Sequence, residues 1–300
     1  MSIRIAVLAG GLGGSRCVDS LARAVGPENV TAIVNVGDDL EILGLHVSPD
    51  LDTILYTLAG LLDEERGWGV RDETYSALTM AGRLGGESWF MLGDRDLGVH
   101  LVRTALLREG APLSEVTARL ARALGIAVRL LPATNDRLRT KVTTDAGELD
   151  FQEWFVARGH RDRVTGLRYE GAESAQPAPG VLDAIAGAEL VVIAPSNPFV
   201  SIEPILAVPG IREAVASKRV AAISPLAGGK AFRGPLAEMM TSLGQEPTAL
   251  GVARLYGDLV ETFVVAAGDE GSPGAVTADI DMVAPARREK VGRKLLEALL

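Results

Sequence analysis

The chain has 300 residues, of which 47% are hydrophobic and 4% aromatic, and its formal net charge is −9. The apolar fraction and the mild charge exclude intrinsic disorder, and the acidic balance argues against a nucleic-acid partner. A single cysteine, Cys17, excludes an internal disulfide and a multi-cysteine zinc site, so a reducing cytoplasm is the expected location. No apolar run reaches the roughly 18 residues that a membrane span needs, and we expect no membrane partner.

The first sixty residues predict a βαβ unit. The apolar run at 3–9 is typical of a buried parallel strand rather than of a signal peptide, because glycines follow it directly. Apolar residues at helical spacing then cover 15–25, and a second strand is predicted at 30–34. An amphipathic helix begins at Pro49 and extends to Leu62.

The middle of the chain is expected to be less regular. Helical stretches are predicted at 72–84, 96–109 and 113–124, and a strand piece at 128–131. Alternation at 141–144 and at 149–156, on either side of a glycine turn, predicts an antiparallel hairpin. We interpret residues 63–170 as an insertion of helices and a hairpin.

Alternation of strands and helices returns from residue 177. The predicted elements are helices at 181–186, 235–243 and 286–300 and strands at 190–194, 220–223 and 262–266. The last helix is expected to pack on the surface or on a partner subunit. Strands separated by helices predict an α/β fold with a doubly wound, mostly parallel Rossmann-like sheet. We interpret 1–300 as one domain, whose nucleotide-binding core is 1–62 and 177–300.

A glycine-rich loop, Gly10-Gly11-Leu12-Gly13-Gly14-Ser15, joins the first strand to the first helix. Backbone N–H groups and the helix dipole can hold an anion there, so phosphate binding is favoured over a tight turn without a ligand. The dinucleotide fingerprint is only partly met, because its third glycine position holds Arg16, and a Walker A ending is missing. The loop alone leaves the nucleotide open.

Two acidic segments follow the glycine loop in the chain. Asp38 and Asp39 end the second strand, near where a dinucleotide fold places its ribose-binding acid, so a dehydrogenase is an alternative at this point. Asp50 and Asp52 open the next helix and, taken alone, would be a cap and a first-turn acid. Four carboxylates beside a phosphate loop suit a hard divalent cation such as Mg²⁺.

Other candidate ligand contacts lie farther along the chain. Ser196 and Asn197 follow a buried strand in a loop bracketed by prolines, where they can donate to a phosphate or cap their own turn. Trp89 and Trp154 have polar neighbours and suit either a flat ligand or the core. The three histidines form no zinc motif, and no G-x-S-x-G elbow is present.

Seven segments in order resemble the 2-phospho-L-lactate transferase family of coenzyme F-420 biosynthesis. They are L-A-G-G-L-G-G-S-R at 8–16, N-V-G-D-D at 35–39, the 46–53 stretch with P-D-L-D-T, W-F-M-L-G-D-R-D-L at 89–97, P-A-T-N-D-R at 132–137, F-Q-E-W-F-V at 151–156 and A-P-S-N-P at 194–198. The resemblance covers nearly the whole chain.

The resemblance implies a transferase with two substrates. The hydroxyl of the deazaflavin Fo would attack the phosphorus of a guanosine diphosphate-linked three-carbon acid, and GMP would leave. The segment at 151–156 resembles bacterial members, which implies a phosphoenolpyruvyl donor and dehydro-F-420-0 as product, rather than a 2-phospholactyl donor and F-420-0. The family also implies a homodimer, and the insertion at 63–170 would form the acceptor side of the site.

The family's roles carry over to this chain as hypotheses. The phosphates would be held at Gly10, Gly11, Gly13, Gly14, Ser15, Asn35, Ser196 and Asn197. Mg²⁺ would be bound by Asp38, Asp50 and Asp52, with Asp50 and Asp38 as catalytic residues. Fo would contact Asp50, Arg95, Trp89 and Trp154.

Two alternatives of other classes remain. A nucleotide-sugar-binding regulatory protein of the gluconeogenesis-factor family would share the glycine loop, but Leu40-Glu41-Ile42 replaces its Gly/Ser-rich continuation. An NAD-dependent dehydrogenase is weakened by Arg16 and by the missing catalytic His/Lys signature.

Overall fold

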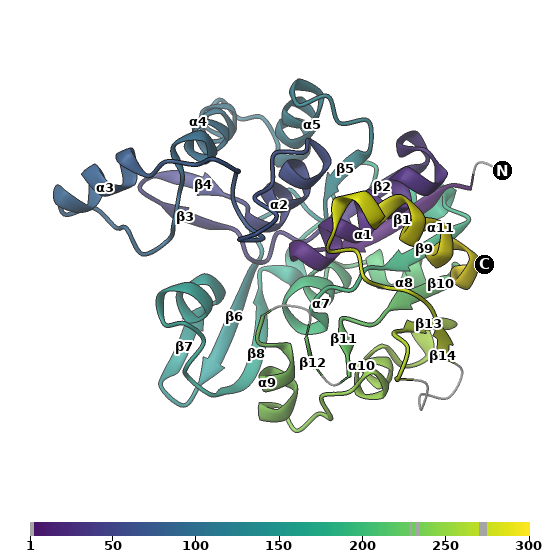
Figure 1. Cartoon of the computed structure of the whole chain (residues 1–300). Helices are drawn as coiled ribbons and strands as arrows, with labels where there is room; N and C mark the ends of the chain where they lie inside the picture. Colours follow the sequence, from purple (N-terminus) through teal and green to yellow (C-terminus); the bar gives the residue numbers. More distant parts are fainter. Residues whose placement is uncertain (1–2, 229, 232–233, 270–274) are drawn as a thin grey trace.

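A seven-stranded sheet forms the centre of the computed structural model, which describes residues 3–228, 230–231, 234–269 and 275–300 (Figure 1). All neighbouring strands in this sheet are parallel. Their order is β14 (Ala275–Thr277), β13 (Thr262–Val265), β10 (Val220–Ile223), β9 (Leu190–Ile193), β1 (Ile5–Ala9), β2 (Val30–Val34) and β5 (Arg129–Pro132). The predicted Rossmann-like α/β class is confirmed.

The direction of winding reverses between β1 and β9. From β1 the chain adds β2 and β5 on one side, whereas from β9 it adds β10, β13 and β14 on the other. Leu8 pairs with Ile193, so the loops that follow these two strands leave the same edge side by side. Parallel sheets bind their ligands in the crevice at such a switch point.

Full burial explains why the central strands are continuous apolar runs. Every residue of β1, β9 and β10 is buried. Alternation of apolar and polar residues is absent because helices cover both faces of a parallel sheet. The apolar runs of the sequence therefore correctly predict the central strands of the sheet.

Helices flank the sheet, and α1 contacts both α2 and α11. They are α1 (Gly11–Val25), α2 (Pro49–Leu58), α3 (Ser76–Arg83), α4 (Asp94–Arg108), α5 (Leu113–Ala123), α6 (Val181–Gly187), α7 (Glu203–Leu206), α8 (Ile211–Ala216), α9 (Leu236–Ser242), α10 (Ala249–Tyr256) and α11 (Arg288–Leu299). No helix in the described part of the chain is both long and apolar enough to cross a membrane.

The C-terminal helix α11 packs on α1 of the same chain. Val291, Leu295 and Leu299 are buried there. A Cβ at Gly292 would lie 2.0 Å from the carbonyl oxygen of Ser20, so the two helices are in close contact. The predicted packing of this helix on the surface of the domain is therefore confirmed, and these three side chains are buried within the same chain.

Two smaller units project from the main body (Figure 1). One contains the antiparallel pair β3 (Leu40–Ile42) and β4 (Leu45–Val47) with α3 and α4. The other is an antiparallel sheet in the order β7 (Gly147–Asp150), β6 (Arg139–Thr144) and β8 (Val164–Glu170). A short pair, β11 (Leu226–Ala227) and β12 (Lys230–Ala231), lies before α9.

Two predictions about the middle of the chain are wrong. The second hairpin strand ends at Asp150, and residues 151–157 are helical, with a π-helical turn at Glu153–Ala157. The aromatic residues at 151, 154 and 155 have helical spacing, which outweighs the apparent alternation. The supposed insertion at 63–170 also contains β5, which pairs with β2 in the main sheet.

Candidate functional site

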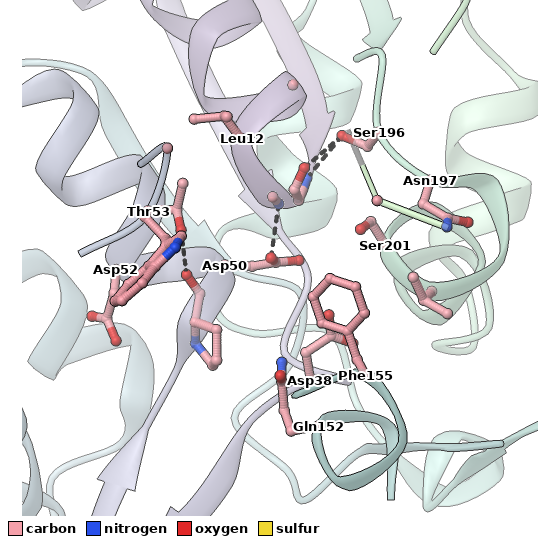
Figure 2. A pocket seen from close by; sticks show the side chains of 18 of the residues that line it. Leu12, Asp38, Asp50, Asp52, Thr53, Gln152, Phe155, Ser196, Asn197 and Ser201 are labelled. Carbon is pink, nitrogen blue, oxygen red and sulfur yellow. Dashed lines mark hydrogen bonds between the residues drawn. The ribbon is translucent and has the colours of Figure 1, made fainter. Parts of the chain in front are cut away.

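A cavity of about 550 Å³ lies at the switch point and is lined by residues from both projecting units (Figure 2). Its wall combines the glycine loop, the first turns of α2, the loop at 67–69, parts of α4, residues 151–156 and the loop at 195–201. Segments far apart in the sequence thus meet at one edge of the sheet, as the winding requires.

Steric limits explain the glycines of the loop. A Cβ at Gly13 would lie 2.2 Å from the carbonyl oxygen of Pro195, and one at Gly10 would lie 2.3 Å from Asp50 Oδ2. Gly11 has a φ of +62°, a backbone conformation that residues with side chains rarely adopt. Gly10, Gly11 and Gly13 line the cavity as predicted.

Ser196 joins the loops that follow β1 and β9. Its Oγ donates to the carbonyl oxygen of Gly10 at 2.7 Å and lies 3.1 Å from the Gly10 amide (Figure 2). Asn197 also lines the cavity, and its side chain accepts from the Phe199 amide to cap the following turn. Both predicted residues therefore lie at the cavity wall, where the nearby Ser201, missed by the sequence analysis, joins them.

Asp50 occupies the centre of the site (Figure 2). Its Oδ1 accepts from the Gly11 amide at 2.7 Å, and its Oδ2 accepts from Asn35 Nδ2 at 2.9 Å. Burial raises the pKa of Asp50 to about 6, even though these hydrogen bonds act in the opposite direction. Asp50 is consequently a stronger base than an ordinary carboxylate while remaining ionised near neutral pH.

Asn35 positions Asp50 and does not face a ligand. It is fully buried and absent from the cavity wall among the described residues, and its Nδ2 also donates to the carbonyl oxygen of Val200. Its Oδ1 accepts from the Gly37 amide. Asn35, which was predicted to contact phosphate directly, instead holds the Asp50 carboxylate in place.

Asp38 lies in the cavity wall near Asp50, and burial together with the charge of Asp50 raises its pKa well above the usual value. Its Oδ1 is buried without a hydrogen-bond partner among the described residues. Asp39 turns to the β3–β4 hairpin, where its Oδ2 accepts from Ser48 and lies 3.0 Å from His46 Nε2, and its Oδ1 is likewise buried without a partner among the described residues. A buried carboxylate oxygen without a donor suits a cation.

Asp52 is not placed to bind a metal, contrary to prediction. It forms a buried ion pair with Arg103 of α4, whose two terminal nitrogens reach both carboxylate oxygens. In Figure 2 its side chain points away from Asp50. Side chains in an α-helix two residues apart face different directions, which explains why the two aspartates separate.

Several other predicted residues do not line the cavity, among those the structure describes. Gly14 packs against Ala9 and Ser196, and Ser15 is buried with its Oγ donating to the carbonyl oxygen of Leu12. Arg95 is exposed and donates to the carbonyl oxygen of Arg71. Gly14 and Ser15 lie near the start of α1 and Arg95 near the start of α4, and their contacts there are with neighbouring protein groups.

The two tryptophans also serve packing. Trp154 is 2% exposed, and its indole nitrogen donates to the carbonyl oxygen of Asp162. Trp89 packs edge-on against Phe90 beside a small apolar cluster. Their neighbours Phe90, Phe151 and Phe155 line the cavity instead.

The helical register at 151–155 decides which rings face the cavity. Phe151 and Phe155 are four residues apart and stack with an interplanar angle of 9°. The motif at 151–156 therefore marks the right segment, but the rings that line the cavity are the i, i+4 pair Phe151 and Phe155 and not the predicted Trp154.

A buried polar network on the α2–α4 side was missed as well. Tyr56 donates to Asp96, and His100 Nδ1 accepts from Arg103. Tyr56, Asp96 and His100 line the cavity. Their separation along the chain gave no sequence signal for this grouping.

Comparison with known proteins identifies the family of this chain. The family model of the 2-phospho-L-lactate transferase CofD matches residues 5–294. The chain belongs to this family. It is therefore a transferase, and the regulatory and dehydrogenase alternatives are set aside.

Relatives in the CofD family carry two names. A phosphoenolpyruvate transferase of Kitasatospora aureofaciens is 46% identical over 285 residues, covering 92% of this chain and 89% of the relative. A 2-phospho-L-lactate transferase of Methanopyrus kandleri is 42% identical over 257 residues, covering 85% and 82%. A solved upf0052-family structure from Bacillus halodurans matches with a TM-score of 0.59 at 19% identity, covering 88% and 80%, and shows the fold alone.

Proposed function

We propose that this CofD-family chain transfers a phosphoenolpyruvyl group from a guanosine diphosphate-linked donor to the primary hydroxyl of the deazaflavin Fo, in coenzyme F-420 biosynthesis. The products are dehydro-F-420-0 and GMP. Several of its relatives are named phosphoenolpyruvate transferases, which supports this donor over the 2-phospholactyl donor.

The observation that carries the proposal is the position of Asp50 beside the glycine loop. Its carboxylate is buried in the cavity wall, and its raised pKa suits a general base. The hydroxyl oxygen of Fo forms a bond to phosphorus, the phosphorus–oxygen bond to GMP breaks, and the hydroxyl proton passes to Asp50. The Gly11 amide is used by Asp50, whereas Gly13 lines the cavity in the first turn of α1, where backbone amides lack an intrahelical acceptor and would orient phosphate oxygens.

The donor set fits Mg²⁺ as part of this proposal. Among the described residues, no group of three or more Asp, Glu, His or Cys side chains is arranged to hold a metal. Mg²⁺, however, is commonly held by one or two carboxylates together with substrate phosphates. Asp38, with its unpartnered Oδ1, would hold it together with phosphate oxygens of the donor, which leaves Asp50 to act as the base, and the ion would neutralise phosphate charge. Homodimer formation remains a prediction.

The experiment combines the protein with Mg²⁺, Fo and the enolpyruvyl or lactyl guanosine donor. We expect a new acidic deazaflavin, detected by fluorescence after anion-exchange separation, with higher kcat/KM for the enolpyruvyl donor. Preference for the lactyl donor would overturn the donor assignment. Absence of product with both donors would overturn the proposed reaction.

A further inference from the structure

The cavity wall has an unbalanced set of charged residues. Of the lining residues that the structure describes, Arg16 is the one arginine or lysine. Four others are aspartates: Asp38, Asp50, Asp52 and Asp96. A diphosphate donor, as in the proposed function on which this inference rests, adds further negative charge to the same space.

Arg16 lies where the donor phosphates are expected. It is in the second turn of α1, which begins at the glycine loop. Its side chain is only 11% exposed, so the guanidinium is held within the wall rather than in solvent. An arginine presents five N–H donors and therefore contacts several acceptors at once.

A chain of ion pairs fixes this guanidinium. Glu64 Oε2 accepts from Arg16 Nη2 at 3.0 Å, and Glu64 Oε1 accepts from Arg288 Nη2 at 2.5 Å. Arg288 of α11 is 1% exposed and also donates to Asp19 Oδ2 at 3.1 Å. Glu64 thus shares one carboxylate between the cavity arginine and a buried arginine that belongs to the last helix.

We propose that Arg16 is a catalytic residue that contacts the donor's phosphates, and that Glu64 and Arg288 are positioning residues that hold it. When the phosphorus–oxygen bond to GMP breaks, its electron pair remains on the leaving phosphate oxygen. Arg16 stabilises the charge that develops there.

The test compares Arg16→Gln with Arg16→Lys and with Arg23→Gln. Arg23 is a matched control because it lies on the same helix as Arg16 and likewise forms an ion pair, in its case with Asp19, but its side chain is 47% exposed. We expect kcat/KM for the guanosine donor to fall about 10²-fold in R16Q and less in R16K, and to stay unchanged in R23Q. Millimolar guanidinium should restore part of the R16Q activity. Wild-type kcat/KM in R16Q, or an equal loss in R23Q, would overturn the proposal.

Glu64→Gln tests the positioning role. It should lower kcat/KM less than R16Q, and the double variant R16Q/E64Q should be no slower than R16Q alone, because Glu64 acts through Arg16. Losses that multiply in the double variant would contradict this dependence. Thermal unfolding of each variant separates this effect from loss of the fold.

Binding of inorganic pyrophosphate separates this inference from the proposed reaction. Calorimetry should show at least about tenfold weaker binding in R16Q than in the wild type. If the wild type fails to transfer either donor group, the proposed reaction fails, yet this binding comparison still tests Arg16. Equal pyrophosphate affinity in R16Q and wild type would overturn the role of Arg16 as a phosphate contact.

Discussion

At the scale of single residues, the site depends on contacts that replace water around a buried carboxylate. Asp50 receives one hydrogen bond from the Gly11 backbone and one from Asn35, which is itself held by Gly37 and Val200. These contacts keep Asp50 ionised at neutral pH despite its burial, while its pKa remains high enough for proton transfer.

Asp50→Asn should abolish transfer and lower the free energy of unfolding by about 1–3 kcal/mol, because one of the two donors, the Gly11 amide or Asn35 Nδ2, loses its acceptor. The amide keeps the shape of the side chain but accepts no proton, so we expect kcat to fall at least about 10²-fold. Glu41→Gln, at an exposed carboxylate on β3, is the matched control and should retain full activity. Wild-type-like turnover in D50N, measured with both substrates saturating, would exclude Asp50 as the base.

The pH dependence follows from the same residue. Asp50 accepts a proton only when ionised, so kcat/KM should fall as the pH drops below about 6, the pKa that burial produces. The measurement is a pH profile of initial rates between pH 4.5 and pH 8. A profile that stays flat down to pH 4.5 would contradict this role.

Gly13→Ala should impair the enzyme through one methyl group. The added Cβ would lie 2.2 Å from the Pro195 carbonyl oxygen, so the loops after β1 and β9 must separate. We expect a loss of about 1–3 kcal/mol in the free energy of unfolding, together with weaker nucleotide binding. Gly98→Ala on α4, which meets nothing within 4 Å, is the control and should be neutral or slightly stabilising. A G13A variant with unchanged stability and affinity would show that the loops are not in tight contact.

At the scale of elements, buried ion pairs connect helices that line the site. Arg103 on α4 and Asp52 on α2 are both buried, and their pair fixes the helix that carries Asp50. The desolvation cost of such a pair is offset only while both partners are present.

Arg103→Met should therefore destabilise the fold by about 3–5 kcal/mol, since it leaves the Asp52 carboxylate buried and unpaired. The double variant Arg103→Met/Asp52→Leu should recover much of this loss, because it removes the second charge as well. Urea denaturation of the three proteins measures the difference. Equal stability in the single and double variants would contradict the argument.

The elements also show what the sequence could and could not predict. β1, β9 and β10 are continuous apolar runs, and the glycine loop follows β1 directly, so the sheet centre and the place of this loop at its edge were predictable. The short strands β3, β4 and β14 were missed because three residues give too little periodicity. The grouping of Tyr56, Asp96 and Arg16 around one cavity depends on tertiary packing, which spacing in a single sequence does not encode.

At the scale of the whole molecule, one cavity receives contributions from both halves of the sheet and from both projecting units. A ligand that fills it therefore contacts segments that only the folded chain brings together. Such a ligand stabilises the native state by an amount that grows with the logarithm of its concentration above its Kd.

GDP should consequently raise the melting temperature, and Mg²⁺ should add to the effect. At a concentration about 100 times its Kd, a ligand contributes about 2.7 kcal/mol of stability. In Asp38→Asn the shift from GDP alone should remain, whereas the increment from Mg²⁺ should disappear. Differential scanning fluorimetry measures both shifts. An unchanged Mg²⁺ increment in D38N would exclude Asp38 as a metal ligand.

The packing of α11 on α1 has a consequence for biosynthesis. About 260 residues separate the two helices in the chain, so the ribosome makes α11 roughly 15–50 seconds after α1 at ordinary elongation rates. During that interval the face of α1 that α11 covers remains open, and Glu64 lacks its contact with Arg288. The nascent chain can thus pair β1 with β2 early, whereas the ion-pair chain from Arg16 through Glu64 to Arg288 is complete only after α11 has been translated.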